Sequence, residues 1–453
     1  MVAFETLLLG IVTGIWPVRL MVAPPVATVE LRLDAAAVGV MHGPPWAMAC
    51  DVGTGPMPHE LTAIGRDASG REVARATQWA NLGRERARVS ALLERDPVTH
   101  QPAAVRLAWE TADMVQPQSV TATLDETPLA VADPHRIALP KVDNDKAHVV
   151  SVEVAFSPQL RDRADLTFGG DVIDRAESEL TAVAVTVPSK RTDLGLHDVQ
   201  GVFSEDSQPL TPIGVDEGHA EVAVVADVSA GAFIAAHPKE WESRSGGAWN
   251  GSFGDGFGAA EIPLPRETIG IGTDRFFLVG TVPSAIADSG RERTFFTTSA
   301  SVRLAWLARH SLSNWLWRTA LPQGQAIADA VAVAASNVAS SNSRRALILI
   351  LTEVPGAAPA VADASTYGVA PVRAYLAALD VPLVVWSLTG SDPGPVTAAW
   401  GPAVAVRDRW EAQAQAKKLE KALDSQRIVW FAGRHLPQRI TLDESKTQLR
   451  FAR

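Results

Sequence analysis

Residues 220–231 read AEVAVVADVSAG, a mostly apolar run that ends in Asp227 and Ser229. Further apolar runs alternate with segments of helical composition, at residues 275–279, 324–340, 346–351, 369–379 and 381–386. Short apolar strands that alternate with helices are typical of a parallel sheet whose two faces are both covered. The sequence therefore predicts an α/β domain of the doubly wound, Rossmann type in the C-terminal half.

The N-terminal part has a different pattern, in which apolar and polar residues alternate. In residues 26–33 (VATVELRL), Val26, Thr28, Glu30 and Arg32 share one face, and mainly apolar residues occupy the other. Runs of the same kind recur between turn signals, at residues 59–65, 72–79, 104–110, 119–124 and 148–156. Short alternating strands at this spacing predict two all-β sandwiches. The charged segment 84–95 fits either a strand or a short helix.

These patterns predict the domain organisation. A chain of 453 residues is too long for a single core, which stops growing at roughly 250 to 300 residues. We expect one β-sandwich over residues 1–100, a second over 101–190, the α/β domain over 191–436, and a C-terminal strand and tail over 437–453.

Residues 26–74 resemble bacterial immunoglobulin-like modules. The matching features are the Pro44-Pro45-Trp46 strand start, the HELTA strand at residues 59–63 and the DASG hairpin at residues 67–70. Ala35 stands where these modules usually have a turn glycine. The resemblance implies immunoglobulin-like sandwiches that act as spacers or adhesive units.

A second resemblance covers about residues 190–435. The stretch Asp227-x-Ser229 resembles the start of the D-x-S-x-S motif of the metal-ion-dependent adhesion site in von Willebrand factor A domains. The segments 196–229, 273–280, 318–321 and 344–353 occur in the order and spacing of von Willebrand factor A-related proteins of Acidobacteria. The resemblance implies a von Willebrand factor A-like fold and a binding function.

The same resemblance implies a Mg²⁺ site with four candidate ligands, which are Asp227, Ser229, Thr319 and Glu353. Two of its positions depart from the motif, because Gly231 replaces a serine and Glu353 replaces an aspartate. Mg²⁺ requires near-octahedral oxygen ligands, so both changes weaken the expected site. The alternative is a degenerate site in which Asp227 and Ser229 only cap the following helix.

Composition excludes several classes of protein. The net charge is −10, and no basic cluster interleaved with aromatic residues is present, so a nucleic acid partner is not expected. With Cys50 alone, the chain has no intramolecular disulfide and no Cys-rich zinc site. Cys50 lies near Trp46 and Met48 and is expected to be a buried, small apolar residue.

The apolar stretch 7–18 (LLLGIVTGIWPV) is too short for a transmembrane helix and contains Pro17. It is either a signal peptide or the first strand of the first sandwich. The family resemblance favours export to the periplasm or cell surface, whereas the poor signal peptide leaves a cytoplasmic location open.

No catalytic motif is present. The sequence lacks GxSxG and HExxH, and no histidine neighbours Ser229 to make it a nucleophile. The glycine-rich stretch 246–258 lacks the strand and the lysine of a phosphate-binding loop. We therefore expect a non-enzymatic adhesion or scaffold protein that binds a protein partner, or alternatively a structural subunit with a metal-independent interface.

Overall fold

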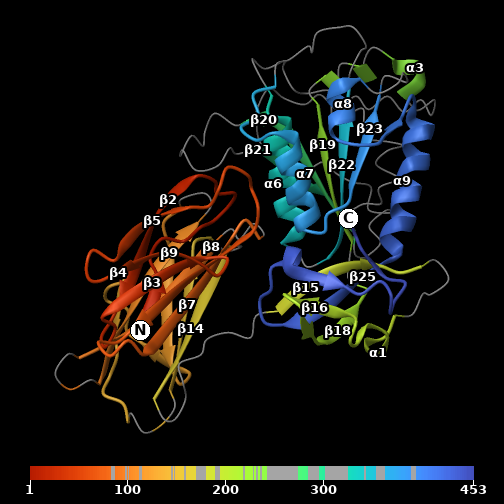
Figure 1. Cartoon of the computed structure of the whole chain (residues 1–453). Helices are drawn as coiled ribbons and strands as arrows, with labels where there is room; N and C mark the ends of the chain where they lie inside the picture. The colour runs from red at the N-terminus through yellow and green to blue at the C-terminus, as the bar shows by residue number, and fades with distance from the viewer. Residues whose placement is uncertain are drawn as a thin grey trace, which may run out of the picture. The chain divides into compact units, whose positions relative to one another are not determined.

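The computed structural model describes two compact units, residues Met1–Thr181 and, in the main, Ala182–Arg453 (Figure 1). The description covers the whole chain except residues 83–86, 97–98, 100, 112–114, 144–145, 147, 158–159, 170–179, 189–193, 218–219, 228, 231–232, 235–236, 242–273, 284–294, 301–324, 341–342, 353–362 and 389–393. Over this part of the chain, no helix has both the length and the apolar character that crossing a bilayer requires.

The first unit begins with a β-sandwich. Its larger sheet has the order β4-β3-β6-β7, with β3 (Thr28–Leu33), β4 (Ala36–Met41), β6 (His59–Arg66) and β7 (Glu72–Ala80). Its smaller sheet has the order β1-β2-β5, with β1 (Val2–Phe4), β2 (Ile15–Val22) and β5 (Ala47–Asp51). Val29, Leu31 and Cys50 are fully buried between the sheets, so the predicted inward face of β3 and the predicted burial of Cys50 are confirmed.

The apolar N-terminal stretch folds as part of this sandwich. Leu7, Leu8 and Val12 lie in its core between β1 and β2. Two side chains at the end of β7 hydrogen-bond to the backbone of this stretch. Gln78 Oε1 accepts from Leu8 N at 3.2 Å, and Asn81 Oδ1 accepts from Val12 N at 2.7 Å. Residues 2–22 thus provide two strands and a buried connection to the first sandwich.

A second sandwich completes the first unit. One sheet has the order β12-β9-β8, with β8 (Ala87–Arg95), β9 (Pro102–Thr111) and β12 (Arg136–Ala138); the other has the order β11-β10-β13-β14, with β10 (Ser119–Leu124), β11 (Thr127–Leu129), β13 (His148–Ala155) and β14 (Arg161–Phe168). Val89 and Leu93 of β8 lie in this second core. Segment 84–95 therefore contributes a strand, and the second sandwich begins before residue 100, where we expected the boundary.

Both sandwiches use the same two-residue hairpin. Asp34–Ala35 joins β3 to β4 and Asp125–Glu126 joins β10 to β11, and all four residues have positive φ, between 47° and 71°. Such turns match the twist of the strands but favour Gly, Asn or Asp. Each aspartate also binds the histidine that opens a neighbouring strand, His59 Nδ1 at 2.5 Å and His148 Nδ1 at 2.6 Å. The tie to Asp125 raises the pKa of His148.

The second unit contains a third pair of small sheets. One has the order β18-β25-β15-β27, with β15 (Leu180–Thr186), β18 (Pro212–Asp216), β25 (Gln426–Ala432) and β27 (Arg450–Phe451). The other has the order β17-β16-β26, with β16 (Phe203–Glu205), β17 (Gln208–Leu210) and β26 (Ile440–Leu442). Val185, Phe203 and Phe431 share their core. Because Val185 pairs with Phe451, the segment near residue 187 belongs here rather than to the second sandwich, and residues 437–453 are part of this sheet pair rather than a separate tail.

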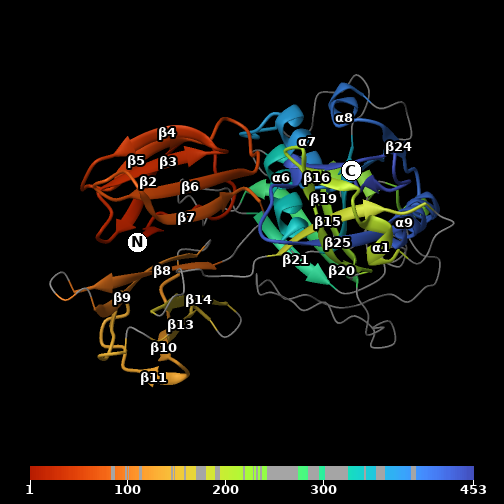
Figure 2. The same ribbon diagram turned by 60° about the horizontal axis from the view of Figure 1, so that its bottom comes forward.

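The α/β part is inserted between β18 and β25. Its sheet has the order β21-β20-β19-β22-β23-β24, with β19 (Ala220–Ala226), β20 (Asp274–Pro283), β21 (Phe295–Ala300), β22 (Arg344–Leu351), β23 (Leu383–Ser387) and β24 (Ala403–Ala405). The pairs are parallel except that of β20 with β21. Helices α6 (Ile327–Ala339) and α7 (Val369–Ala378) cover one face, and α9 (Arg409–Asp424) covers the other (Figures 1 and 2).

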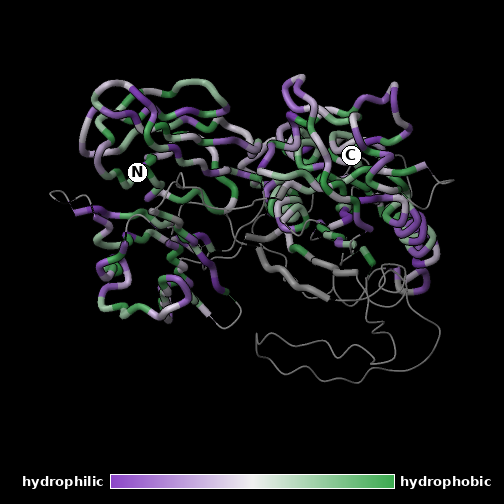
Figure 3. The backbone as a smooth tube through the Cα atoms, turned by 90° about the horizontal axis from the view of Figure 1, so that it is seen from below, coloured by the Kyte–Doolittle hydropathy of each residue, from purple (hydrophilic) through white to green (hydrophobic). Residues whose placement is uncertain are grey.

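Sequence composition explains the two faces. Helix α6 consists mainly of alanine and valine and is buried along nearly its whole length between the sheet and α7. Helix α9 buries only Ala412, Ala416, Leu419 and Leu423, and the rest of it is largely hydrophilic, as seen at the right of Figure 3. Its start is fixed by Asp408, which accepts from Trp410 N and Glu411 N, both at 2.8 Å.

Candidate functional site

Asp227 lies at the carboxyl edge of the parallel sheet, directly after the central strand β19. Ala226, the last residue of β19, is in register with Gly280 of β20 and Ile350 of β22. β22 ends one residue further on, at Leu351, and β20 continues to Pro283. Ligands of open α/β sheets bind at this edge. The Asp227 residue is only 7% exposed, so its carboxylate is an acidic group held largely away from solvent.

The partners of the Asp227 carboxylate are neutral. Oδ1 accepts from Ser229 N at 2.7 Å, and Oδ2 accepts from Thr352 N at 3.4 Å. The side chains of Ser229 and Gln325 also hydrogen-bond to the carboxylate. Burial raises the pKa of Asp227 in spite of these donors. The ionised form therefore lacks full compensation from the described residues, and a cation would provide it.

Two residues that the sequence analysis missed complete this environment. Gln325 comes just before α6 and is 4% exposed, and its Oε1 lies 3.2 Å from the hydroxyl of Thr281. The Thr281 hydroxyl is also 3.2 Å from Ala226 O, the carbonyl that precedes Asp227. A threonine that follows an apolar strand, and a glutamine at a helix start, were the available signals. Neither forms a motif, and only the sheet register brings them to Asp227.

Residues 363–367, which precede α7, are hydrogen-bonded to the start of α6. Asp329, in the first turn of α6, is 3% exposed and accepts from Thr366 N at 2.8 Å and Tyr367 N at 3.0 Å. Ser365 Oγ accepts from Ala328 N at 3.0 Å. The bond from Ala328 N satisfies an amide at the start of α6 that has no partner within the helix. The bonds to Asp329 tie residues 366–367 to the same helix start.

The structure brings together half of the predicted metal ligands. Asp227 and Ser229 are adjacent, and Ala230 N donates to Asp227 O at 2.9 Å, which forms the turn that leads into the next segment. Thr319 and Glu353 lie outside the described residues, as does Gly231. Within the described ranges, no group of three or more His, Cys, Asp or Glu side chains could hold a metal ion. One carboxylate and one hydroxyl are compatible with Mg²⁺ but do not form a complete site.

The glycine-rich stretch 246–258 also lies outside the described residues.

A second group of buried charges lies at the opposite, amino edge of the sheet. Arg345 of β22 is 4% exposed and stands in register with Glu221 of β19, which is 1% exposed. Asp380, just before β23, is also 1% exposed and accepts from Arg453 Nε at 2.9 Å. Burial raises the pKa of Asp380 to about 6, and the charges of Arg453 and Arg345 oppose this shift. Acids and arginines are thus buried together at this edge.

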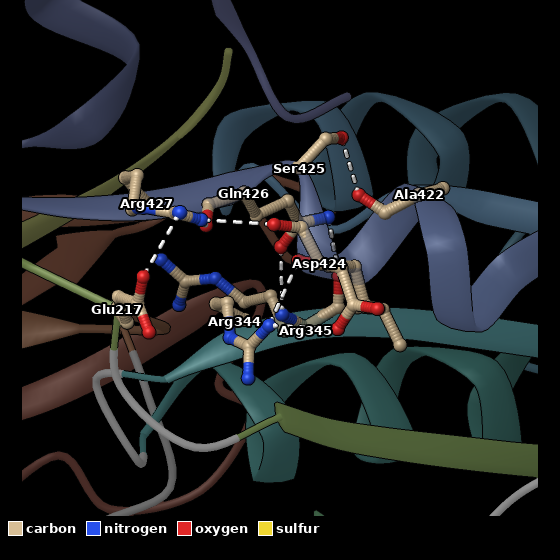
Figure 4. A network of polar contacts seen from close by, with 9 residues as sticks. Glu217, Arg344, Arg345, Ala422, Asp424, Ser425, Gln426 and Arg427 are labelled. Carbon is tan, nitrogen blue, oxygen red and sulfur yellow. Dashed lines mark hydrogen bonds and ion pairs between the residues drawn. The ribbon is translucent and has the colours of Figure 1, made fainter. Parts of the chain in front are cut away.

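Figure 4 shows how this amino edge is joined to the small sheets. The Gln426 side chain accepts from Arg345 N at 3.0 Å and donates to Arg345 O at 3.2 Å. Arg427 binds Glu217 at 3.0 Å, and Arg344 binds Asp424 at 3.3 Å. These contacts join β22 to α9 and β25, and β25 to the residue that follows β18, which indicates a structural role. Among the described residues, Arg345 Nε and Asp380 Oδ2 are buried without a hydrogen-bond partner.

No family model and no curated protein matches the chain. Among solved structures, fibronectin(III)-like modules of Clostridium thermocellum CbhA are similar at 12% identity and a TM-score of 0.15, over 38% of this chain and 94% of theirs. The central fibronectin-III array of RIM-binding protein is similar at 13% identity and a TM-score of 0.18, over 41% of this chain and 78% of its own. At these values the similarities do not identify a family, and they do not bear on the α/β part.

Proposed function

We propose that this chain is a non-enzymatic adhesion or scaffold protein. In this proposal the β-sandwiches present a von Willebrand factor A-like domain, and the carboxyl edge of its sheet binds a protein partner. The observation that carries the proposal is Asp227, a buried carboxylate at the ligand-binding edge whose described partners are all neutral. Its resemblance to the first aspartate of an adhesion-site motif supports the same role.

The expected chemistry is cation-dependent contact. Asp227 and the Ser229 hydroxyl would be two ligands of Mg²⁺, and the resemblance adds Thr319 and Glu353. Bound there, Mg²⁺ would compensate the charge of the buried carboxylate and would attract an oxygen of a partner. Gln325 and Thr352 N hold the Asp227 carboxylate in one orientation, so it is prepared for this contact.

The test uses the full chain immobilised as bait for an extract of the native host. A genuine partner is retained in Mg²⁺, is lost in EDTA, and is lost with Asp227→Ala. Asp424→Ala is the matched control, because Asp424 is an exposed aspartate at the other edge of the sheet. A partner set that is the same for wild type and Asp227→Ala, with and without chelator, would refute the proposal.

One observation favours a second candidate, a structural subunit with a metal-independent interface. Asp227 already accepts hydrogen bonds from Ser229, Thr352 and Gln325, which hold its carboxyl group in place. An aspartate that only fixes the turn after β19 would make the same bonds. Light scattering distinguishes the two candidates: self-association that EDTA leaves unchanged supports the structural subunit, and chelator-sensitive binding supports adhesion.

A further inference from the structure

A shallow pocket of about 300 Å³ lies on the first unit, where the end of β2 meets the second sandwich. Its apolar lining includes Val22, Leu92 and Ala103, and its polar lining includes Glu94, Arg106 and Arg136. The pocket shares no residue with the Asp227 edge, so whatever it binds goes beyond the proposed function.

The strand register places two like charges side by side in this pocket. Arg136 of β12 pairs directly with Arg106 of β9. Like charges in directly opposite positions of an antiparallel pair are destabilising. Glu94 of β8 is the carboxylate that offsets them: its Oε1 lies 3.1 Å from Arg106 Nε, and its Oε2 lies 2.8 Å from Arg136 Nε. Two guanidinium groups therefore share one carboxylate.

This arrangement leaves a surplus of positive charge. Arg95 and Asp96 also line the pocket and offset each other, so the net charge of the lining is one positive charge. The side chains of Arg106 and Arg136 are 44% and 55% exposed, so both can reach a ligand. Each arginine forms an ion pair with Glu94, and the repulsion between the two arginines remains.

The chemistry of the two arginines defines the ligand. Both contact Glu94 through Nε, and among the described contacts their terminal nitrogens remain as donors. A guanidinium group matches the two oxygens of a carboxylate. The apolar lining suits the aliphatic stem of an acidic side chain. We propose that this pocket binds carboxylates of an acidic polypeptide segment, with Arg106 and Arg136 as the binding residues and Glu94 as an internal competitor that holds them in place.

The test is calorimetric titration of the full chain, at low ionic strength, with a short poly-glutamate peptide and a poly-glutamine peptide of equal length. We expect binding of the acidic peptide only. Arg106→Gln and Arg136→Gln should each weaken it about tenfold, the typical value of one charge-assisted hydrogen bond. Glu94→Gln should strengthen it, because the internal carboxylate no longer competes. A purely structural ion pair would not produce these opposite effects.

The matched control is Arg161→Gln. Arg161 lies on the same sandwich, is 56% exposed and pairs with one glutamate, Glu153, at 2.9 Å, but it does not line the pocket. Its variant should bind the peptide as the wild type does, and thermal melts confirm that each variant is folded. Absence of poly-glutamate binding, equal losses in Arg161→Gln and Arg136→Gln, or equally tight binding of free glutarate would overturn the proposal. None of these outcomes depends on Asp227 or on a metal.

Discussion

The two edges of the parallel sheet bury acidic groups in opposite ways. At the amino edge, Glu221 and Asp380 are buried with Arg345, and Arg453 binds Asp380 from the protein surface. At the carboxyl edge, Asp227 is buried among the amides and hydroxyls of neutral residues. Burying an ionised carboxylate is expensive unless an opposite charge accompanies it. The protein supplies that charge at one edge and not, among the described residues, at the other.

At the amino edge the buried charges are part of the framework. The Gln426 side chain binds the main chain of Arg345, so the amino edge fastens the inserted sheet to β25. Among the described residues, the environment of Asp227 contains donors but no compensating charge. Carboxylates with a raised pKa occur at functional sites and also in structural networks, such as that of Asp380. The two edges should therefore respond differently to an added cation.

The largest effect is expected for Arg345→Met. It removes the buried positive charge that acts on both Glu221 and Asp380, of which Asp380 keeps its contact with Arg453. Removing one partner from a group of buried charges typically costs about 3 to 5 kcal/mol of unfolding free energy. Urea unfolding measures it. Arg407→Met is the control, because Arg407 is 63% exposed and binds Glu411 on the surface; it should change stability by less than about 0.5 kcal/mol. Equal effects of the two variants would contradict a structural role for the amino edge.

Asp380→Asn tests the amino edge through pH. The pKa of Asp380 rises from 3.8 to about 6 on folding, so the folded state binds a proton more tightly than the unfolded state. Relative to Asp380→Asn, the wild type should therefore lose stability as pH rises from about 4 to about 6, by roughly 2 to 3 kcal/mol. Urea midpoints across this window measure the difference. Parallel pH profiles of the two proteins would show that Asp380 does not titrate in this way.

Gln325→Leu and Gln325→Lys test the carboxyl edge. The leucine variant removes a neutral donor from Asp227 and leaves the Thr281 hydroxyl with one partner fewer, at a cost of about 1 to 2 kcal/mol. The lysine variant gives Asp227 a cation and so makes this edge resemble the amino edge. It should be more stable than the leucine variant in EDTA, as measured by thermal melting. A lysine variant less stable than the leucine variant would contradict the view that Asp227 lacks a positive partner.

Local patterns predicted much of this architecture. The alternation in residues 26–33 and the apolar run before Asp227 each report on their own burial, so β3 and β19 follow from a few neighbouring residues. The turn at Asp34–Ala35 adopts positive φ at both residues although the usual glycine is absent. Asp34 is a residue type that tolerates this conformation, and its bond to His59 holds it there, whereas Ala35 has neither feature.

Long-range pairing could not be predicted in the same way. Val185 pairs with Phe451, and the residues of neither short segment identify the strand with which it pairs. The sequence analysis therefore missed the insertion of the α/β part between β18 and β25. Gln325 was not identified as a neighbour of Asp227 for the same reason, because only the alignment of the strands brings the two residues together. The same reason hid the pairing of Arg106 with Arg136, which depends on the register of β9 and β12.

Thermal melting of the full chain in excess Mg²⁺ or Mn²⁺ and in EDTA shows directly whether the carboxyl edge of the sheet binds a cation. If the carboxyl edge is a cation site, metal should raise the melting temperature of the wild type by a few degrees, because a ligand that binds only the folded state stabilises it. The melting temperature of Asp227→Ala should not respond, and Asp424→Ala should respond as the wild type does. Wild-type melting curves that coincide in metal and in EDTA would contradict a cation site at Asp227.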